Sequence, residues 1–122
     1  MGSVAGNLMM THLHPDFVSD MGTILTAADA TLSVTYAASK GAEITRVSVA
    51  QFFGMPSAGL VILSVFLPAL SSSERLITQK VAVRRVNAHA LVNAAFKFDV
   101  DELKGWLEEG SPSFLPEASG PQ

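Results

Sequence analysis

The feature that most restricts how this chain can fold is the apolar run Val61–Leu67, which reads VILSVFL and stops at Pro68. Val and Ile branch at Cβ and favour strands, whereas proline lacks the backbone N–H that a central strand needs. A run without polar alternation is typical of a strand covered on both faces. We therefore expect a fully covered strand over Val61–Leu67, with other elements packed on each side of it.

Further strands are indicated by alternation of apolar and polar residues, which is typical of half-buried strands. Thr31–Tyr36 and Ile77–Val83 both have this period of two. Glu43–Val47 follows the turn Ser39–Gly41 and can pair with the strand before it as a hairpin. The Ala-rich stretch Leu91–Phe98 fits either a strand or a helix.

Short helices are indicated by capping residues. Ser19 can cap a helix over residues 20–27, with Asp20 in the first turn near the positive end of the helix dipole. Ser48 can cap a brief helical turn before Gly54. An amphipathic helix is expected between residues 101 and 110, where apolar residues recur at helical spacing among acids (Leu103, Trp106 and Leu107).

The two ends of the chain are expected to be less regular. The residues of Ser3–Met10 are small and apolar around Gly6-Asn7, a pattern typical of places where the backbone closely approaches another group. Thr11–Asp20 contains Pro, Asp, Ser and two His residues, which favours a loop. The last dozen residues are rich in Pro, Ser and Gly and are expected to fray. Together the elements predict an α+β fold dominated by antiparallel strands, with short helices.

Composition and charge exclude several classes of protein. The net charge is −3, and no Lys/Arg stretch is dense enough for binding to nucleic-acid phosphates. The chain has no Cys, so a disulfide, a zinc–thiolate site or iron–sulfur ligation within it is excluded. The longest apolar run, Gly59–Leu70, is too short to span a bilayer. We expect a cytoplasmic protein without a nucleic-acid or membrane partner.

The apolar content also bears on partners. Of the 122 residues 48% are hydrophobic and 16% are charged, the opposite of a disordered composition. A domain of this size hides only about 60–70% of its unfolded surface. We therefore expect part of the apolar surface to pack against further polypeptide.

Single motifs do not identify a reaction. His12 and His14 would share one face of a strand, but no third ligand accompanies them, so we expect no metal site. The spacing of the carboxylates places no two of them together for acid–base chemistry (Asp16, Asp20 and Glu43). Ser71–Ser73 lacks the context of a nucleophile elbow. No catalytic residue is therefore expected.

The order of several weak motifs, however, resembles a known family. The motifs are SVAGNL at Ser3–Leu8, Ser19-Asp20, Phe52-Phe53-Gly54, Val61–Pro68 and KVAVRR at Lys80–Arg85. Over residues 3–99 this set is similar to the flavin domain of the molybdenum hydroxylases, the xanthine dehydrogenase and aldehyde oxidase family. The two-histidine segment and the stretch NAHALVNAAF look more like the arthropod aldehyde oxidase branch.

The resemblance implies a PCMH-type FAD-binding domain that relays electrons from iron–sulfur clusters to oxygen or NAD. Residues 1–58 would be the end of the FAD-contacting subdomain, 59–100 the start of an antiparallel-sheet subdomain, and 101–122 a divergent tail. The molybdopterin, the [2Fe-2S] clusters and the family's glycine-rich phosphate loop would lie outside this chain, so we expect it to be inactive alone. The family is homodimeric, and the remaining domains of such an enzyme would be partners.

The resemblance also implies cofactor contacts at eight positions. Ser3, Val4, Ala5, Gly6 and Asn7 match a segment lying along FAD, although Ala5 stands where the family usually has glycine. Asp20 matches a carboxylate that contacts FAD, Ile62 an apolar residue near the flavin ring, and Lys80 a lysine at the cofactor. A cation there, reinforced by Arg84-Arg85, would favour the negative charge that develops on a reduced flavin.

Other interpretations of the same residues stay open. Ile62 can be a core residue, and Asp20 can be a charge at a helix cap. The whole chain can be a non-catalytic binding or interaction module that keeps the flavoprotein fold, or a small structural subunit.

Overall fold

The structure is a computed structural model that describes residues 2–38 and 43–109. The turn expected at Ser39–Gly41 and the fraying expected in the last dozen residues lie outside the described residues. The elements follow in the order α1 (Val4–Leu13), α2 (Asp20–Ala27), β1 (Thr31–Tyr36), β2 (Thr45–Ser48), α3 (Val49–Phe53), β3 (Leu60–Phe66), β4 (Glu74–Ala82), β5 (Ala90–Asp99) and α4 (Val100–Glu108). Short helices combined with antiparallel strands confirm the α+β class.

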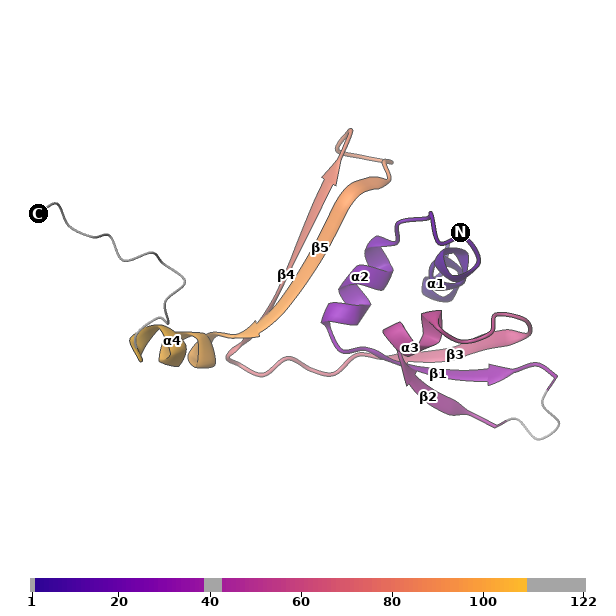
Figure 1. The fold of residues 1–122 in the computed structure, drawn as a ribbon, viewed down its shortest axis with the longest axis horizontal. Helices are drawn as coiled ribbons and strands as arrows, with labels where there is room; N and C mark the ends of the chain where they lie inside the picture. Colours follow the sequence, from indigo (N-terminus) through magenta and orange to yellow (C-terminus); the bar gives the residue numbers. More distant parts are fainter. Residues whose placement is uncertain (1, 39–42, 110–122) are drawn as a thin grey trace, which may run out of the picture.

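Strands β1, β2 and β3 form one antiparallel sheet in the order β2-β1-β3 (Figure 1). The hairpin expected from sequence alternation is present, because Thr31 lies opposite Ser48 and Val34 lies opposite Thr45. Strand β3 pairs with the other edge of β1. The sheet therefore combines strands from both sides of the subdomain boundary expected at residue 58.

Helices α1, α2 and α3 cover one face of this sheet (Figure 1), and the hydrophobic core lies between them. Alternation along β1 turns Leu32 and Val34 inward, where both are almost completely buried. The other core side chains come from the three helices, from β3 and from the residue before β1 (Leu8, Leu25, Ala30, Val49, Phe52 and Leu60). Phe52 is the largest of the wholly buried side chains.

The expectation that the apolar run forms a strand covered on both faces is wrong. The strand is present, but only Leu60 is buried, and Val61, Leu63 and Phe66 are exposed. Helices lie on one face of the sheet, and no element within the described ranges covers the other. An apolar run shows which neighbours a strand favours, but it does not show whether such neighbours are present. Within the described ranges, no element covers one face of this sheet.

Strands β4 and β5 form a separate, two-stranded antiparallel sheet joined by a polar connection at residues 83–89. The Ala-rich stretch that fitted either a strand or a helix is therefore a strand. The pair Lys80–Asn93 lies on the face toward α2, where Lys97 also pairs with Asp29 just after α2. The pairs Val81–Val92 and Ile77–Phe96 lie on the opposite, outer face.

The loop expected over residues 11–20 is wrong in part, because Thr11–Leu13 continue α1. Ser3 caps this helix, its hydroxyl accepting a hydrogen bond from the Gly6 amide at 3.0 Å. Gly, Asn, Thr and His have low helix propensity, which conceals the helix in the sequence. Burial of Leu8 against the core supplies the stability that propensity does not.

The remaining helices lie close to where the sequence indicates them. The helix expected over residues 20–27 is α2, and Ser48 caps α3 in a reciprocal capping box with Gln51. Helix α4 is capped by Asp99, whose carboxylate accepts from the amides of Asp101 and Glu102 at 2.8 and 3.2 Å. Within residues 2–38 and 43–109, no helix is both long and apolar enough to cross a membrane.

The core assignment is tested by truncating one buried and one exposed phenylalanine. Phe52→Ala should lower the free energy of unfolding by about 3–5 kcal/mol, because it removes a wholly buried ring and leaves a cavity. Phe66→Ala, at a side chain that is 65% exposed, should change it by no more than about 0.5 kcal/mol. Equal losses in urea denaturation would contradict the position of the core.

Candidate functional site

The structure brings two of the predicted site residues, Asp20 and Lys80, into direct contact. Lys80 Nζ donates to Asp20 Oδ2 at 2.6 Å, and Asn93 Nδ2 donates to Asp20 Oδ1 at 2.9 Å. Asp20 is the first residue of α2, whereas Lys80 and Asn93 face each other across β4 and β5. Thr23 completes the cluster by donating its hydroxyl to Asn93 Oδ1 at 2.8 Å. The cluster joins the start of α2 to the β4–β5 hairpin.

The contacts of Asp20 favour its ionised form. The hydrogen bond from Lys80, followed by that from Asn93, holds the pKa of Asp20 below its ordinary value of 3.8, although partial burial opposes this shift. The positive charges of Lys80 and His89 lower this pKa further. Asp20 and Lys80 thus form an ion pair at this end of the hairpin.

Several predicted residues line a hollow at the N-terminal end of α1. The hollow has a volume of about 640 Å³, and its lining includes Gly2, Ser3, Val4, Gly6, Asn7, Met10, Phe17 and Met21. A smaller cavity of about 230 Å³ lies between α2 and the hairpin, with Asp20, Lys80 and Asn93 in its wall. Six of the eight predicted residues therefore line one or the other of two cavities beside α2.

Ser19 connects residues that line these two cavities. Its buried hydroxyl donates to Asn7 Oδ1 and accepts from the Gly22 amide at 2.8 Å. The side chain of Asn7 thus holds α1 against the start of α2, directly beside Asp20. The sequence comparison implied a ligand contact for Asn7, and the structure adds this positioning contact.

The remaining two predicted residues lie elsewhere. Ala5 is half-buried in the first turn of α1 and is not among the residues that line the hollow. Ile62 lies in β3 opposite Val34, where it packs against the hydrophobic core. Its surroundings match the alternative interpretation of Ile62 as a core residue.

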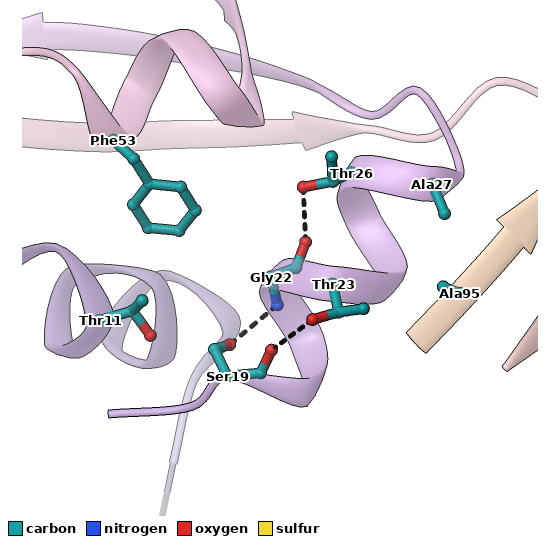
Figure 2. A pocket seen from close by; sticks show the side chains of 8 residues that line it. All are labelled: Thr11, Ser19, Gly22, Thr23, Thr26, Ala27, Phe53 and Ala95. Atoms are coloured by element: carbon teal, nitrogen blue, oxygen red, sulfur yellow. Dashed lines mark hydrogen bonds between the residues drawn. The ribbon is translucent and has the colours of Figure 1, made fainter. Parts of the chain in front are cut away.

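Figure 2 shows a third hollow, of about 440 Å³, along the side of α2. Its hydroxyl groups are already engaged, since Thr26 donates to the Gly22 carbonyl at 2.7 Å and Thr23 to Asn93 Oδ1 at 2.8 Å. A Cβ on Gly22 would lie 3.3 Å from Ser19 Oγ and 3.5 Å from the Phe53 ring, so a larger residue here would crowd the Ser19 hydroxyl. The hollow therefore reflects the packing of α2 and offers few polar groups for recognition.

Sequence reasoning missed four residues near the site. Asn93 is a polar residue in an otherwise apolar strand, and this contrast could have indicated a special role. Thr23 carries no comparable signal. Phe17 and His89 meet edge to face with ring centroids 5.6 Å apart, which brings the loop after α1 against the start of β5.

The two histidines, for which no metal site was expected, lie in different surroundings. The His12 ring packs on Phe52 with a centroid separation of 5.0 Å, and His14 follows the end of α1. In the part of the chain that the structure describes, no three His, Asp or Glu side chains cluster as metal ligands.

The cavities have the volume of small-molecule sites, and one of them is lined by cations. A volume of about 640 Å³ lies within the range of small-molecule sites, about 300–1,000 Å³. The hollow lies at the start of α1, where the first N–H groups of a helix attract anionic groups. The hairpin adds a polar hollow of about 460 Å³ lined by Lys80, Arg84, Arg85 and Asn87.

Comparison with protein-family models finds no match, and comparison with curated proteins finds none either.

The ion pair is tested by its pH dependence. Because the pKa of Asp20 is lower in the folded chain, its stabilisation is fully present above the ordinary carboxyl pKa of 3.8 and is lost as the pH falls through the lower, folded-state value. Asp20→Asn should therefore lower the free energy of unfolding near neutral pH, and its deficit relative to the wild type should shrink below pH 3.8.

Asp16→Asn provides the control, because Asp16 is exposed and forms no ion pair within residues 2–38 and 43–109. Chemical denaturation of the three proteins at several pH values measures the effect. A deficit of Asp20→Asn that stays constant from neutral to acidic pH would contradict the ion pair.

Proposed function

We propose that this chain supplies part of the FAD site in a PCMH-type flavoprotein domain, one that relays electrons within an aldehyde- or xanthine-oxidising molybdenum hydroxylase. The observation that carries the proposal is the convergence of motif residues that lie far apart in the sequence. Asp20 and Lys80 meet at 2.6 Å, and Asn7 is hydrogen-bonded to Ser19, the neighbour of Asp20. Chance similarity of short motifs gives no reason for these residues to meet.

The N-terminal segment would hold the cofactor through its backbone. Ser3 engages the Gly6 amide as a cap, so the N–H groups of Val4 and Ala5 are the ones left for an anionic or carbonyl group. Small side chains in this turn keep the backbone accessible. Asn7 keeps its amide nitrogen for a ligand, since only its oxygen receives the Ser19 hydroxyl in the described structure.

The hairpin would supply the electrostatic part of the site. When bound, FAD supplies the acceptance and onward transfer of electrons, chemistry that amino-acid side chains do not perform. Lys80, with Arg84 and Arg85, would favour negative charge on the flavin. Asp20 would accept a hydrogen bond from a hydroxyl or ring N–H, while fixing the position of Lys80.

A non-catalytic interaction module is the second candidate function. The observation that favours it is the amount of exposed apolar surface on the hairpin, where Val81, Val92 and Phe96 are 49%, 61% and 60% exposed. Monomeric proteins rarely expose a contiguous apolar patch unless it is functional. The two functions are compatible, because this surface and the Lys80–Asn93 pair lie on opposite faces of the hairpin.

The flavin proposal is tested by titrating the chain with FAD and following quenching of flavin fluorescence. We expect binding weaker than about 1 µM, because few contacts must offset the cost of ordering both partners. Lys80→Met should weaken this binding severalfold by removing a cation from the site. Arg46→Met is the matched control, since Arg46 is an exposed residue of β2 in the other sheet.

Equal effects of the two substitutions would contradict a site at Lys80. Binding at micromolar affinity or tighter would contradict the expectation that the chain alone holds only part of the site. Complete absence of binding at the highest protein concentration, with a folded chain, would favour the interaction module.

A further inference from the structure

The hollow of about 640 Å³ at the start of α1 is largely apolar, and none of the residues that line it is charged. Its apolar wall is formed by Val4, Met10, Phe17 and Met21, and its polar side chains are those of Ser3 and Asn7. Val4 and the two methionines are 36–49% exposed, so their apolar atoms are open to a ligand. Sites for small molecules normally combine apolar walls with a few polar groups that fix the orientation of the ligand.

Phe17 is the aromatic side chain of this wall, and it is held in place from two sides. Its amide donates to the His14 carbonyl at 2.9 Å, which closes a turn after α1. Its ring meets the His89 ring edge to face, with centroids 5.6 Å apart and an interplanar angle of 81°. The Phe17 ring is half-buried, so part of it stays accessible from the hollow. A side chain that is already fixed costs less to order when a ligand binds.

Met10 and Met21 extend this wall from two different helices. Met10 belongs to α1 and Met21 is the second residue of α2. A thioether is polarisable and makes favourable contacts with aromatic rings, and two aromatic rings attract each other in offset or edge-to-face arrangements. Three side chains that favour contact with an aromatic ring therefore line one uncharged hollow.

Asn7 supplies a polar group that such a ring can use. Its Oδ1 accepts the Ser19 hydroxyl, which leaves the Nδ2 hydrogens to donate to a ligand. Ser19 is buried and also caps α2, so this contact holds the amide of Asn7 in one orientation. A hydrocarbon ring would leave the Nδ2 donor unpaired, which is costly, and a phosphate would find no cation in the lining. A heteroaromatic ring, with acceptor atoms at its edge, satisfies both the wall and the donor.

We propose that the hollow at the start of α1 binds the planar heteroaromatic ring of a nucleotide, with Phe17 as its aromatic contact and Asn7 Nδ2 as donor to the edge of the ring. Adenine and isoalloxazine share this chemistry, because both are planar and uncharged and both carry acceptor atoms at the edge. The resemblance to the flavin domain assigns no role to Phe17, Met10 or Met21. The proposal rests on the proposed function for the identity of the ligand, and it adds which part of that ligand lies at α1.

The test is to add riboflavin and, separately, adenosine to the full chain labelled with ¹³C at the methionine methyl groups. Both probes carry a heteroaromatic ring and no phosphate. The methyl signals of Met10 and Met21 should shift, because the ring current of a bound ring acts on nearby groups. Met9 and Met55 are internal controls that should stay unchanged, since both pack against the hydrophobic core. Shifts with riboflavin would assign the hollow to the isoalloxazine half, and shifts with adenosine would assign it to the adenine half.

Substitution of Phe17 shows whether its ring makes the contact. Phe17→Leu should weaken binding of the active probe at least about fivefold, as expected when a ring loses its stacking partner. Phe17→Tyr keeps an aromatic ring and should bind within about twofold of the wild type. Phe66→Leu is the control, because Phe66 is an exposed phenylalanine of β3 and should leave binding unchanged. Circular dichroism shows whether each variant is folded.

Two results would overturn the proposal. One is that neither probe shifts Met10 and Met21, and the other is that a folded Phe17→Leu chain binds the active probe as tightly as the wild type. The outcome is separate from that of the proposed function. Addition of FAD that shifts the amides of residues 80–89 but neither methionine would overturn this inference alone. Ring probes that shift both methionines, together with FAD that leaves residues 80–89 unchanged, would support the inference and contradict the proposed function.

Discussion

The buried hydroxyl of Ser19 is the interaction on which the arrangement of the candidate site depends. It caps α2 by accepting the Gly22 amide and donates to Asn7 Oδ1, so one side chain fixes the start of α2 and the position of α1. Ser19 is only 7% exposed, and burial of a hydroxyl is tolerated because both of its hydrogen-bonding functions are satisfied. Asp20 is the next residue, and its carboxylate connects α2 to the hairpin by accepting hydrogen bonds from Lys80 and Asn93.

The parts of the fold that the sequence predicts correctly are those decided within a few residues. The cap at Ser19, the capping box at Ser48 and the alternation in β1 each depend on local chemistry, and each is found where expected. Helix α1 was missed because its stability comes from burying Leu8 and not from propensity. The exposure of one face of β3 could not be predicted either, since it depends on which elements pack nearby.

For the candidate site too, the sequence predicted individual residues but not how they meet. Asp20 and Lys80 were both expected at the cofactor, but their ion pair depends on where the hairpin docks, which no local pattern reveals. Asn93 was missed because its role follows from the register that places it opposite Lys80. This register gives the hairpin two distinct faces, one against α2 that carries Lys80 and Asn93 and an exposed one that carries Ile77 and Phe96.

The central claim is that FAD contacts the start of α1, the start of α2 and the distal end of the hairpin. It is tested most directly by recording the amide NMR spectrum of the isotopically labelled chain during addition of FAD, a measurement that detects weak binding residue by residue. The account predicts shifts confined to residues 3–7, 19–23 and 80–89, with the amides of β1 and β2 unchanged. Shifts concentrated on the β1–β2–β3 sheet, or an unchanged spectrum at saturating FAD, would contradict it.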